Sequence, residues 1–175
     1  MAGSCGSCAL CCKVMAIPEL QKADGEWCKH ICANHKGCGI YKDRPPVCRN
    51  FLCIWRQNPI MGKHMRPDKC GVVFGMGTSP VIVAAYVDPL RPDAWKKRAV
   101  WTFIEQVVMN GDFNVVISVV DPAKPEDALK RIIFYKENNL LMRVDKSFTP
   151  PDKDGVNWVI HSPDDNPHVY GGHKC

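Results

Sequence analysis

Residues 5–12 read Cys-Gly-Ser-Cys-Ala-Leu-Cys-Cys, and this stretch predicts how the first part of the chain folds. A C-x2-C turn directs two sulfurs at one metal, and the backbone amides between them can donate hydrogen bonds to sulfur. Gly6 and Ser7 are small enough to let such a turn tighten. The longer C-x2-C-x2-C spacing also suits the loop around a cubane iron-sulfur cluster, so both zinc and iron-sulfur fit. We therefore expect this segment to fold around thiolate-bound metal.

Cys11 and Cys12 are adjacent, which limits how they can share a metal. Neighbouring side chains point to opposite faces of an extended chain and diverge by about 100° in a helix. Two adjacent thiolates therefore do not easily bind the same tetrahedral ion. Either one of them faces a second centre, or one ligates and the other is a buried thiol. Both assignments stay open at this point.

A second group of cysteines follows at wider spacings, between residues 28 and 53. A four-coordinate centre uses four ligands, so nine candidates predict two centres with one thiol to spare, or one multi-metal cluster. The place of Cys28 and Cys32 in the ligand set stays open. Cys70 stands apart from the group, and a buried thiol is expected there. The nine candidate metal ligands are Cys5, Cys8, Cys11, Cys12, Cys28, Cys32, Cys38, Cys48 and Cys53.

The compartment decides between metal ligands and disulfides. Residues 1–10 lack the apolar run of about 7–15 residues that a secretory signal contains. No stretch of the chain reaches the roughly 18 apolar residues of a membrane span. A cytoplasmic protein without a membrane segment is therefore expected. In a reducing cytosol, a dense set of cysteines more often binds metal than forms disulfides.

The net charge of +5 is carried by the cysteine-rich part of the chain. Residues 1–70 hold eleven Lys and Arg against five Asp and Glu, whereas residues 71–175 hold twelve against thirteen. Metal-bound thiolates would offset much of this excess, so nucleic acid is not the expected partner, although a protein partner is compatible with it. The alternative hypothesis is a zinc-stabilised interaction module that binds nucleic acid with a steep salt dependence. Its candidate cations are Lys36, Lys42, Arg44, Arg49, Arg56, Lys63 and Arg66.

From residue 71 onward, the sequence predicts regular secondary structure. An apolar stripe that includes Val100, Ile104 and Val108 predicts a helix from Pro92 to about residue 109. A second helix is expected from Pro125 to about residue 137, and an irregular tail after residue 145. Four strands are predicted from runs of β-branched and aromatic residues, at 72–74, 81–87, 113–120 and 140–144.

These elements predict an α+β fold. Residues 1–70 contain too few apolar side chains to close a core of their own, so metal crosslinks would supply the missing stability. Residues 71–175 form a small α/β unit of about four strands and two helices. We expect the irregular cysteine-rich region to pack on this unit within one compact protein.

The cysteine-rich region resembles the bacterial CxxCxxCC cysteine-cluster family (YkgJ-like), which is described as zinc- or iron-chelating or as iron-sulfur-containing. The resemblance covers about the first third of the chain and implies metal binding, with iron-sulfur favoured by the family label, while it leaves the activity open. The matching residues are Cys5, Cys8, Cys11, Cys12, Cys38, Ile40, Tyr41, Arg44, Pro45, Cys48, Arg49, Phe51 and Cys53.

Three residues of this segment are candidates for support around the metal. Arg44 and Arg49 can offset the negative charge of a tetrathiolate centre and donate to its sulfurs, and Tyr41 can shield it from water. We therefore expect a thiolate metal-binding protein, with a redox or iron-handling role. An open coordination position would favour an enzyme, and four closed sulfurs a carrier or a structural site.

Overall fold

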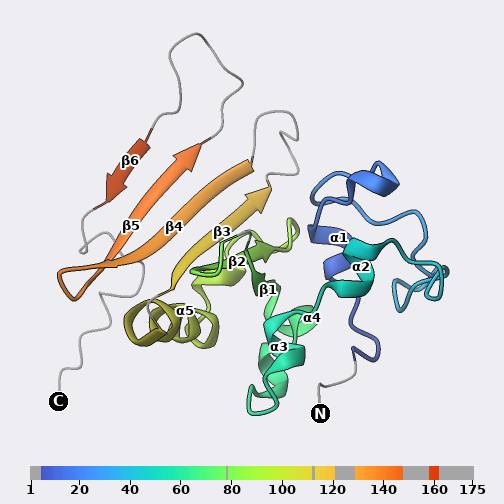
Figure 1. Ribbon diagram of the computed structural model, residues 1–175, viewed down its shortest axis with the longest axis horizontal. Coiled ribbons are helices and arrows are strands. Elements are labelled where there is room, and N and C mark those ends of the chain that lie inside the picture. Colours follow the sequence, from blue (N-terminus) through green and yellow to red (C-terminus); the bar gives the residue numbers. More distant parts are fainter. Residues whose placement is uncertain (1–4, 78, 112, 121–128, 148–157, 162–175) are drawn as a thin grey trace, which may run out of the picture.

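The computed structural model describes residues 5–77, 79–111, 113–120, 129–147 and 158–161. A six-stranded sheet occupies one side of the molecule, with its strands in the order β1-β2-β3-β4-β5-β6. The strands lie in a row in Figure 1, and the cysteine-rich region lies beyond β1. The α+β class predicted from the sequence is confirmed.

The sheet is mixed because one connection crosses over and the others do not. β2 pairs with β3 in parallel, through a crossover that contains helix α5, and all other neighbouring strands pair antiparallel. The strands are β1 (Val72–Met76), β2 (Ile82–Val87), β3 (Asn114–Val120), β4 (Leu129–Glu137), β5 (Leu140–Ser147) and β6 (Trp158–His161).

Helix α5 (Arg98–Gly111) covers one face of this sheet and closes the main core. Val100, Ile104 and Val108 recur every fourth residue and are buried, as the apolar stripe predicts. The ring of Phe134 packs edge-on against Trp101, with the ring centroids 5.2 Å apart. The helix begins at Arg98 and not at Pro92, because residues 94–96 form a separate 3-10 turn, η3 (Ala94–Lys96), that buries Trp95.

The prediction of a second helix from Pro125 to about residue 137 is wrong, because β4 occupies residues 129–137. Ile132 and Phe134 are buried at a period of two, and β-branched and aromatic side chains of this kind suit a pleated surface. Asn138 and Asn139 form the two-residue turn to β5, and both have positive φ, as a type I′ hairpin requires. Residues 125–128 lie outside the described part of the chain.

The predicted strands are present, and the sheet has two more. β1, β2, β3 and β5 cover the four predicted ranges within a few residues. The prediction of an irregular tail after residue 145 is wrong at residues 146–147, which belong to β5, and at residues 158–161, which pair with β5 as strand β6. The rest of that tail, residues 148–157 and 162–175, lies outside the described residues.

The cysteine-rich region consists of turns and short helices, as its weak periodicity predicts. Pro18, Pro46 and Pro67 each open one of these helices, where the missing N–H of proline carries no cost. None of the described helices is long and apolar enough to cross a membrane. The short helices are α1 (Cys11–Val14), η1 (Pro18–Leu20), α2 (Pro46–Asn50), α3 (Ile54–Gln57), η2 (Lys63–Met65) and α4 (Pro67–Cys70).

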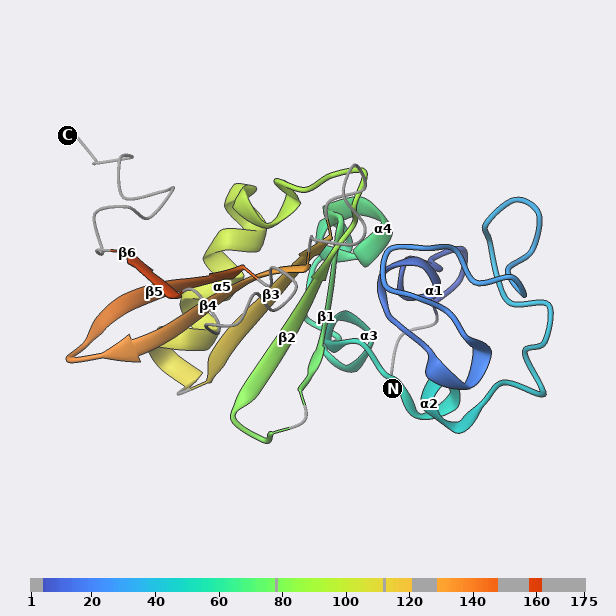
Figure 2. The ribbon, with the colours of Figure 1, turned by 90° about the horizontal axis from the view of Figure 1, so that it is seen from above.

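Strand β1 lies between the other strands and the cysteine-rich region (Figure 2), and side chains on both of its faces are buried. Val72 and Phe74 face the main core, whereas Val73 packs with Leu10 and Val14 of the cysteine-rich region. The ring of Phe51 approaches β1 so closely that a Cβ on Gly75 would lie 2.8 Å from it. Only glycine therefore leaves room for this contact.

A buried ion pair also ties α1 to the sheet. The Lys13 ammonium donates to Asp88 Oδ1 over 2.8 Å, and both side chains are less than one-tenth exposed. The Arg91 guanidinium donates to the other carboxylate oxygen over 3.0 Å. Burial alone would raise the pKa of Asp88, but the hydrogen bonds from Lys13, from the Leu90 amide and from Arg91 outweigh it and lower the pKa below 3.8.

Replacing Asp88 with Asn should destabilise the protein by about 3–5 kcal/mol at neutral pH, because Lys13 then stays buried without its counter-charge. Since the pKa of Asp88 is lower in the folded state, its stabilising effect is complete above the unfolded value and is lost as the pH falls through the folded value. Urea unfolding at neutral and acidic pH measures both effects.

Asp93→Asn is the matched control, because Asp93 forms an ion pair with Lys96 at the surface and 74% of its side chain is exposed. Loss of this surface ion pair should lower the free energy of unfolding by no more than about 1 kcal/mol. If both variants lost the same small amount of unfolding free energy, this result would contradict the structural role of the buried ion pair.

Candidate thiol-lined metal site

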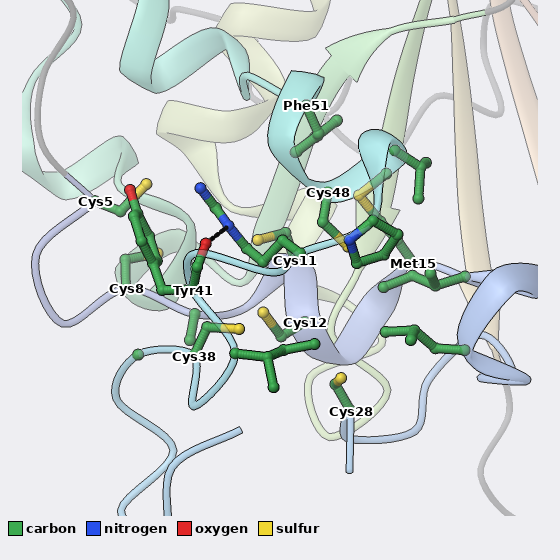
Figure 3. Close-up of a pocket in the computed structure, with 18 of the residues that line it drawn as sticks. Cys5, Cys8, Cys11, Cys12, Met15, Cys28, Cys38, Tyr41, Cys48 and Phe51 are labelled. Atoms are coloured by element: carbon green, nitrogen blue, oxygen red, sulfur yellow. Dashed lines mark hydrogen bonds between the residues drawn. The ribbon is translucent and has the colours of Figure 1, made fainter. Parts of the chain in front are cut away.

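Seven of the nine candidate cysteines line one cavity of about 280 Å³ (Figure 3). They come from three segments that are distant in sequence: residues 5–12, the loop between residues 28 and 38, and helix α2. None of the ten described cysteines is in a disulfide. The seven are Cys5, Cys8, Cys11, Cys12, Cys28, Cys38 and Cys48.

The other three described cysteines lie outside the cavity lining. Cys53 is the residue before helix α3, and its thiol is close enough to the first group to feel the charge of Cys5. Cys32 does not line the cavity. Cys70 is buried and donates to the carbonyl oxygens of Met65 and Val72, as expected for a thiol that is not a ligand.

Backbone amides point at two of the sulfurs. Burial raises the pKa of Cys8 to about 11, although amide hydrogen bonds from Leu10 and Asp68 act in the opposite direction. Burial also raises the pKa of Cys53, against a hydrogen bond from the Arg56 amide. Amide donors of this kind stabilise a thiolate and are typical of the surroundings of metal-bound cysteine.

Cys11 and Cys12 interact directly through a hydrogen bond between their side chains. This bond raises the pKa of Cys11, and burial and the charges of Cys12, Cys8 and Cys5 raise it further. The same bond lowers the pKa of Cys12 to about 7, with help from the positive charges of Lys22 and Arg44 and against the effect of burial. The hydrogen bond between the two side chains therefore favours the proton on Cys11 and the thiolate on Cys12.

Two cations stand beside Cys12. The ammonium of the buried Lys22 donates to three backbone carbonyls, including Lys13 O over 2.9 Å and Ala23 O over 2.8 Å, and burial lowers its pKa. The guanidinium of Arg44 donates to Tyr41 O over 3.0 Å and lies 3.8 Å from the centre of the Tyr41 ring. Both residues of this stacked pair line the cavity.

The other predicted supporting cation, Arg49, is exposed and does not line the cavity, whereas Arg56 does. The positive charge of Arg56 lowers the pKa of Cys53. Sequence reasoning assigned Arg56 only to the nucleic-acid alternative. Its position three residues after a cysteine that precedes a helix was the signal for its proximity to that sulfur.

Apolar side chains complete the wall of the cavity. The apolar lining residues include Met15, Ile17, Leu20, Ile40, Val47 and Phe51. Such a wall limits the access of water to the sulfurs and strengthens the electrostatic interactions among them. The site therefore combines thiols, amide donors, cations and an apolar wall.

The thiols line the same cavity, but their side chains are not arranged as the ligands of a metal ion. Within the described ranges, no three side chains of His, Cys, Asp or Glu meet the spacing of a metal-ion site. The donor set nevertheless has the chemistry of a site for a thiophilic metal, because the described residues of the cavity lining include seven cysteines and no His, Asp or Glu.

The fold and the cavity define an α+β protein with a thiol-rich site beside its sheet. Comparison with protein-family models, with curated proteins and with solved structures found no match. The resemblance to the cysteine-cluster family therefore stays a prediction from the sequence.

The pKa of Cys12 predicts its reactivity in metal-free, reduced protein. At pH 7 about half of the Cys12 side chain should be thiolate, so iodoacetamide should modify it well before Cys8. The rate at Cys12 should level off above pH 7, whereas the rate at Cys8 should rise up to about pH 11. Mass spectrometry of the modified peptides measures both rates, and a fast phase that persists in Cys12→Ser would refute this assignment.

Proposed function

We propose that the protein binds metal through cysteine thiolates in this cavity, as an iron-sulfur cluster or as a zinc or iron site. The observation that carries the proposal is that seven cysteines from three separate segments meet on one cavity wall. Ordinary packing gives no reason for so many thiols to gather in one place. Thiolate ligation of a soft metal does.

The local structure of the cysteine-rich region supports the same proposal. Its α-helices are four or five residues long, and such short helices are not stable by themselves. Metal ligation by α1, the loop between residues 28 and 38, and α2 would crosslink these segments. The free energy of metal binding then contributes directly to folding.

The resemblance to the cysteine-cluster family favours iron-sulfur over zinc. An iron-sulfur cluster would supply one-electron redox chemistry, whereas zinc would supply crosslinking alone. The chain's own contribution is clear in either case: amides and cations stabilise the thiolates, and the apolar wall limits water. A redox or iron-handling role follows from the first case and a structural role from the second.

The nucleic-acid alternative has less support, because its cations are partly occupied. Arg44 and Arg56 line the thiol cavity, and Arg66 pairs with Asp68 over 2.6 Å. Lys36, Lys42, Arg49 and Lys63 are exposed. Binding to single-stranded or duplex nucleic acid that falls steeply with rising salt would favour this alternative.

Protein purified without oxygen and without a histidine tag should contain metal bound by cysteine. Iron with acid-labile sulfide and a brown chromophore identifies a cluster, whereas a colourless protein with zinc identifies a structural site. Elemental analysis, sulfide determination and an absorption spectrum distinguish these results. Protein without metal, with paired cysteines, would refute the proposal.

Cys48→Ala tests the cavity. Cys70→Ala is its control, because Cys70 is a buried cysteine that lies outside the cavity lining. The first variant should hold less metal than the unmodified protein, and the second should keep the full metal content. Equal metal content in both variants would place the metal elsewhere.

A further inference from the structure

We propose that the thiols divide into two separate four-sulfur metal centres, which meet at the dipeptide Cys11–Cys12 and take one of its sulfurs each. This inference rests on the proposed function of metal binding and adds the ligands of each centre. It leaves Cys32 without a role as ligand. The first set is Cys5, Cys8, Cys11 and Cys53, and the second set is Cys12, Cys28, Cys38 and Cys48.

The first set gathers between the N-terminal turn and strand β1. The amide of Cys8 donates to Cys5 O over 2.9 Å, which closes the turn that carries both thiols. Cys11 and Cys53 pack against the same apolar cluster, at Val73 of β1. The charge of Cys53 also acts on Cys8, that of Cys5 on Cys53, and those of Cys8 and Cys5 on Cys11, so each of the four thiols lies near at least one other member of the set.

The second set gathers around the loop between residues 28 and 38. The amide of Cys28 donates to Cys12 O over 2.9 Å, and an isolated β-bridge between Ile31 and Cys38 folds the loop back. Burial raises the pKa of Cys48, and the charges of Cys12, Cys28 and Cys38 raise it further. The Cys48 thiol therefore lies near the other three members of this set.

The division at Cys11 and Cys12 follows from the geometry of helix α1. Both residues lie in its single turn, where the side-chain directions of adjacent residues differ by about 100°, so the two sulfurs can turn apart once both are thiolates and no proton is shared between them. Figure 3 shows Cys5 and Cys8 at one end of the cavity, and Cys28 and Cys48 toward the other, with the adjacent pair between them. Besides their mutual interaction, Cys11 is affected by the charges of Cys8 and Cys5, whereas Cys12 is affected by the charges of Lys22 and Arg44.

Each set also has a cation of its own. Arg56 acts on Cys53 in the first set, and Arg44 acts on both Cys12 and Cys48 in the second. A four-thiolate centre with one divalent ion carries a net negative charge, which a nearby guanidinium offsets. Two separate cations match two separate centres.

The metal content of the unmodified protein gives the first test. Anaerobically purified full-length protein, analysed by native mass spectrometry and elemental analysis, should hold two equivalent complements of metal, either two zinc ions or two iron-sulfur clusters. Metal equal to a single complement would overturn the division while leaving the proposed function intact. Protein without metal would overturn both.

Pairs of alanine substitutions test which thiols share a centre. Cys48→Ala and Cys53→Ala should each reduce the metal content about twofold, because each removes one ligand of a different four-sulfur centre. Combining Cys53→Ala with Cys11→Ala should cause no further loss, because both belong to the first set. Combining Cys53→Ala with Cys12→Ala should remove the remaining metal, because the second centre is then also broken.

The two double variants are matched in number and type of substitution, so general unfolding would affect both. When Cys48→Ala takes the place of Cys53→Ala in the double variants, the pattern should reverse. Half of the metal should remain when Cys48→Ala is combined with Cys12→Ala, and all of it should be lost when Cys48→Ala is combined with Cys11→Ala. Cys32→Ala should keep the full metal content. Complete loss of metal in either single variant, Cys48→Ala or Cys53→Ala, or equal content in the two matched double variants, would overturn the division into two centres.

Discussion

The buried ion pair between Lys13 and Asp88 fixes the position of helix α1, and the arrangement of the thiol cavity depends on that position. Lys13 follows directly after Cys11 and Cys12, so the contact that ties the helix to the end of β2 also orients the two thiols. Arg91 completes the pair from the other side of the carboxylate. A single turn of helix therefore connects the stable sheet to the cysteine-rich region.

This connection explains how a region with little core of its own can place a site. Val73 of β1 supplies an apolar surface for Leu10 and Val14, and the lack of a side chain at Gly75 lets Phe51 pack beside it. The sheet thus orders the two ends of the region, at α1 and after α2. Apart from the buried Cys28, the loop between residues 28 and 38 is half-buried or exposed, and the proposed metal ligation would hold it through Cys28 and Cys38.

The apolar residues of strands β1, β2, β3 and β5 and of helix α5 recur with clear periods, so the sequence predicted these elements. It failed at β4, where Ile132 and Ile133 next to Leu129 fit a helical stripe as well as a strand, and only the pairing with β3 and β5 decides between them. It also did not anticipate β6, a four-residue strand whose order depends on its neighbour.

The candidate site was predicted in composition but not in arrangement. Spacing identified the cysteines, and seven of the nine candidates line one cavity. The separation of Cys32 from that cavity, and the proximity of Cys53 to Cys5, depend on how the loops fold and have no signature in local sequence. The same holds for Lys22, whose buried ammonium caps the end of α1 from eight residues away.

X-ray absorption spectroscopy at the edge of the bound metal, on protein purified without oxygen, tests the central claim of thiolate ligation most directly. If the cavity cysteines bind the metal, its coordinating atoms should all be sulfur, at about 2.3 Å if the metal is zinc. A shell dominated by nitrogen or oxygen would contradict it, because the ligands would then not be the cysteines of the cavity.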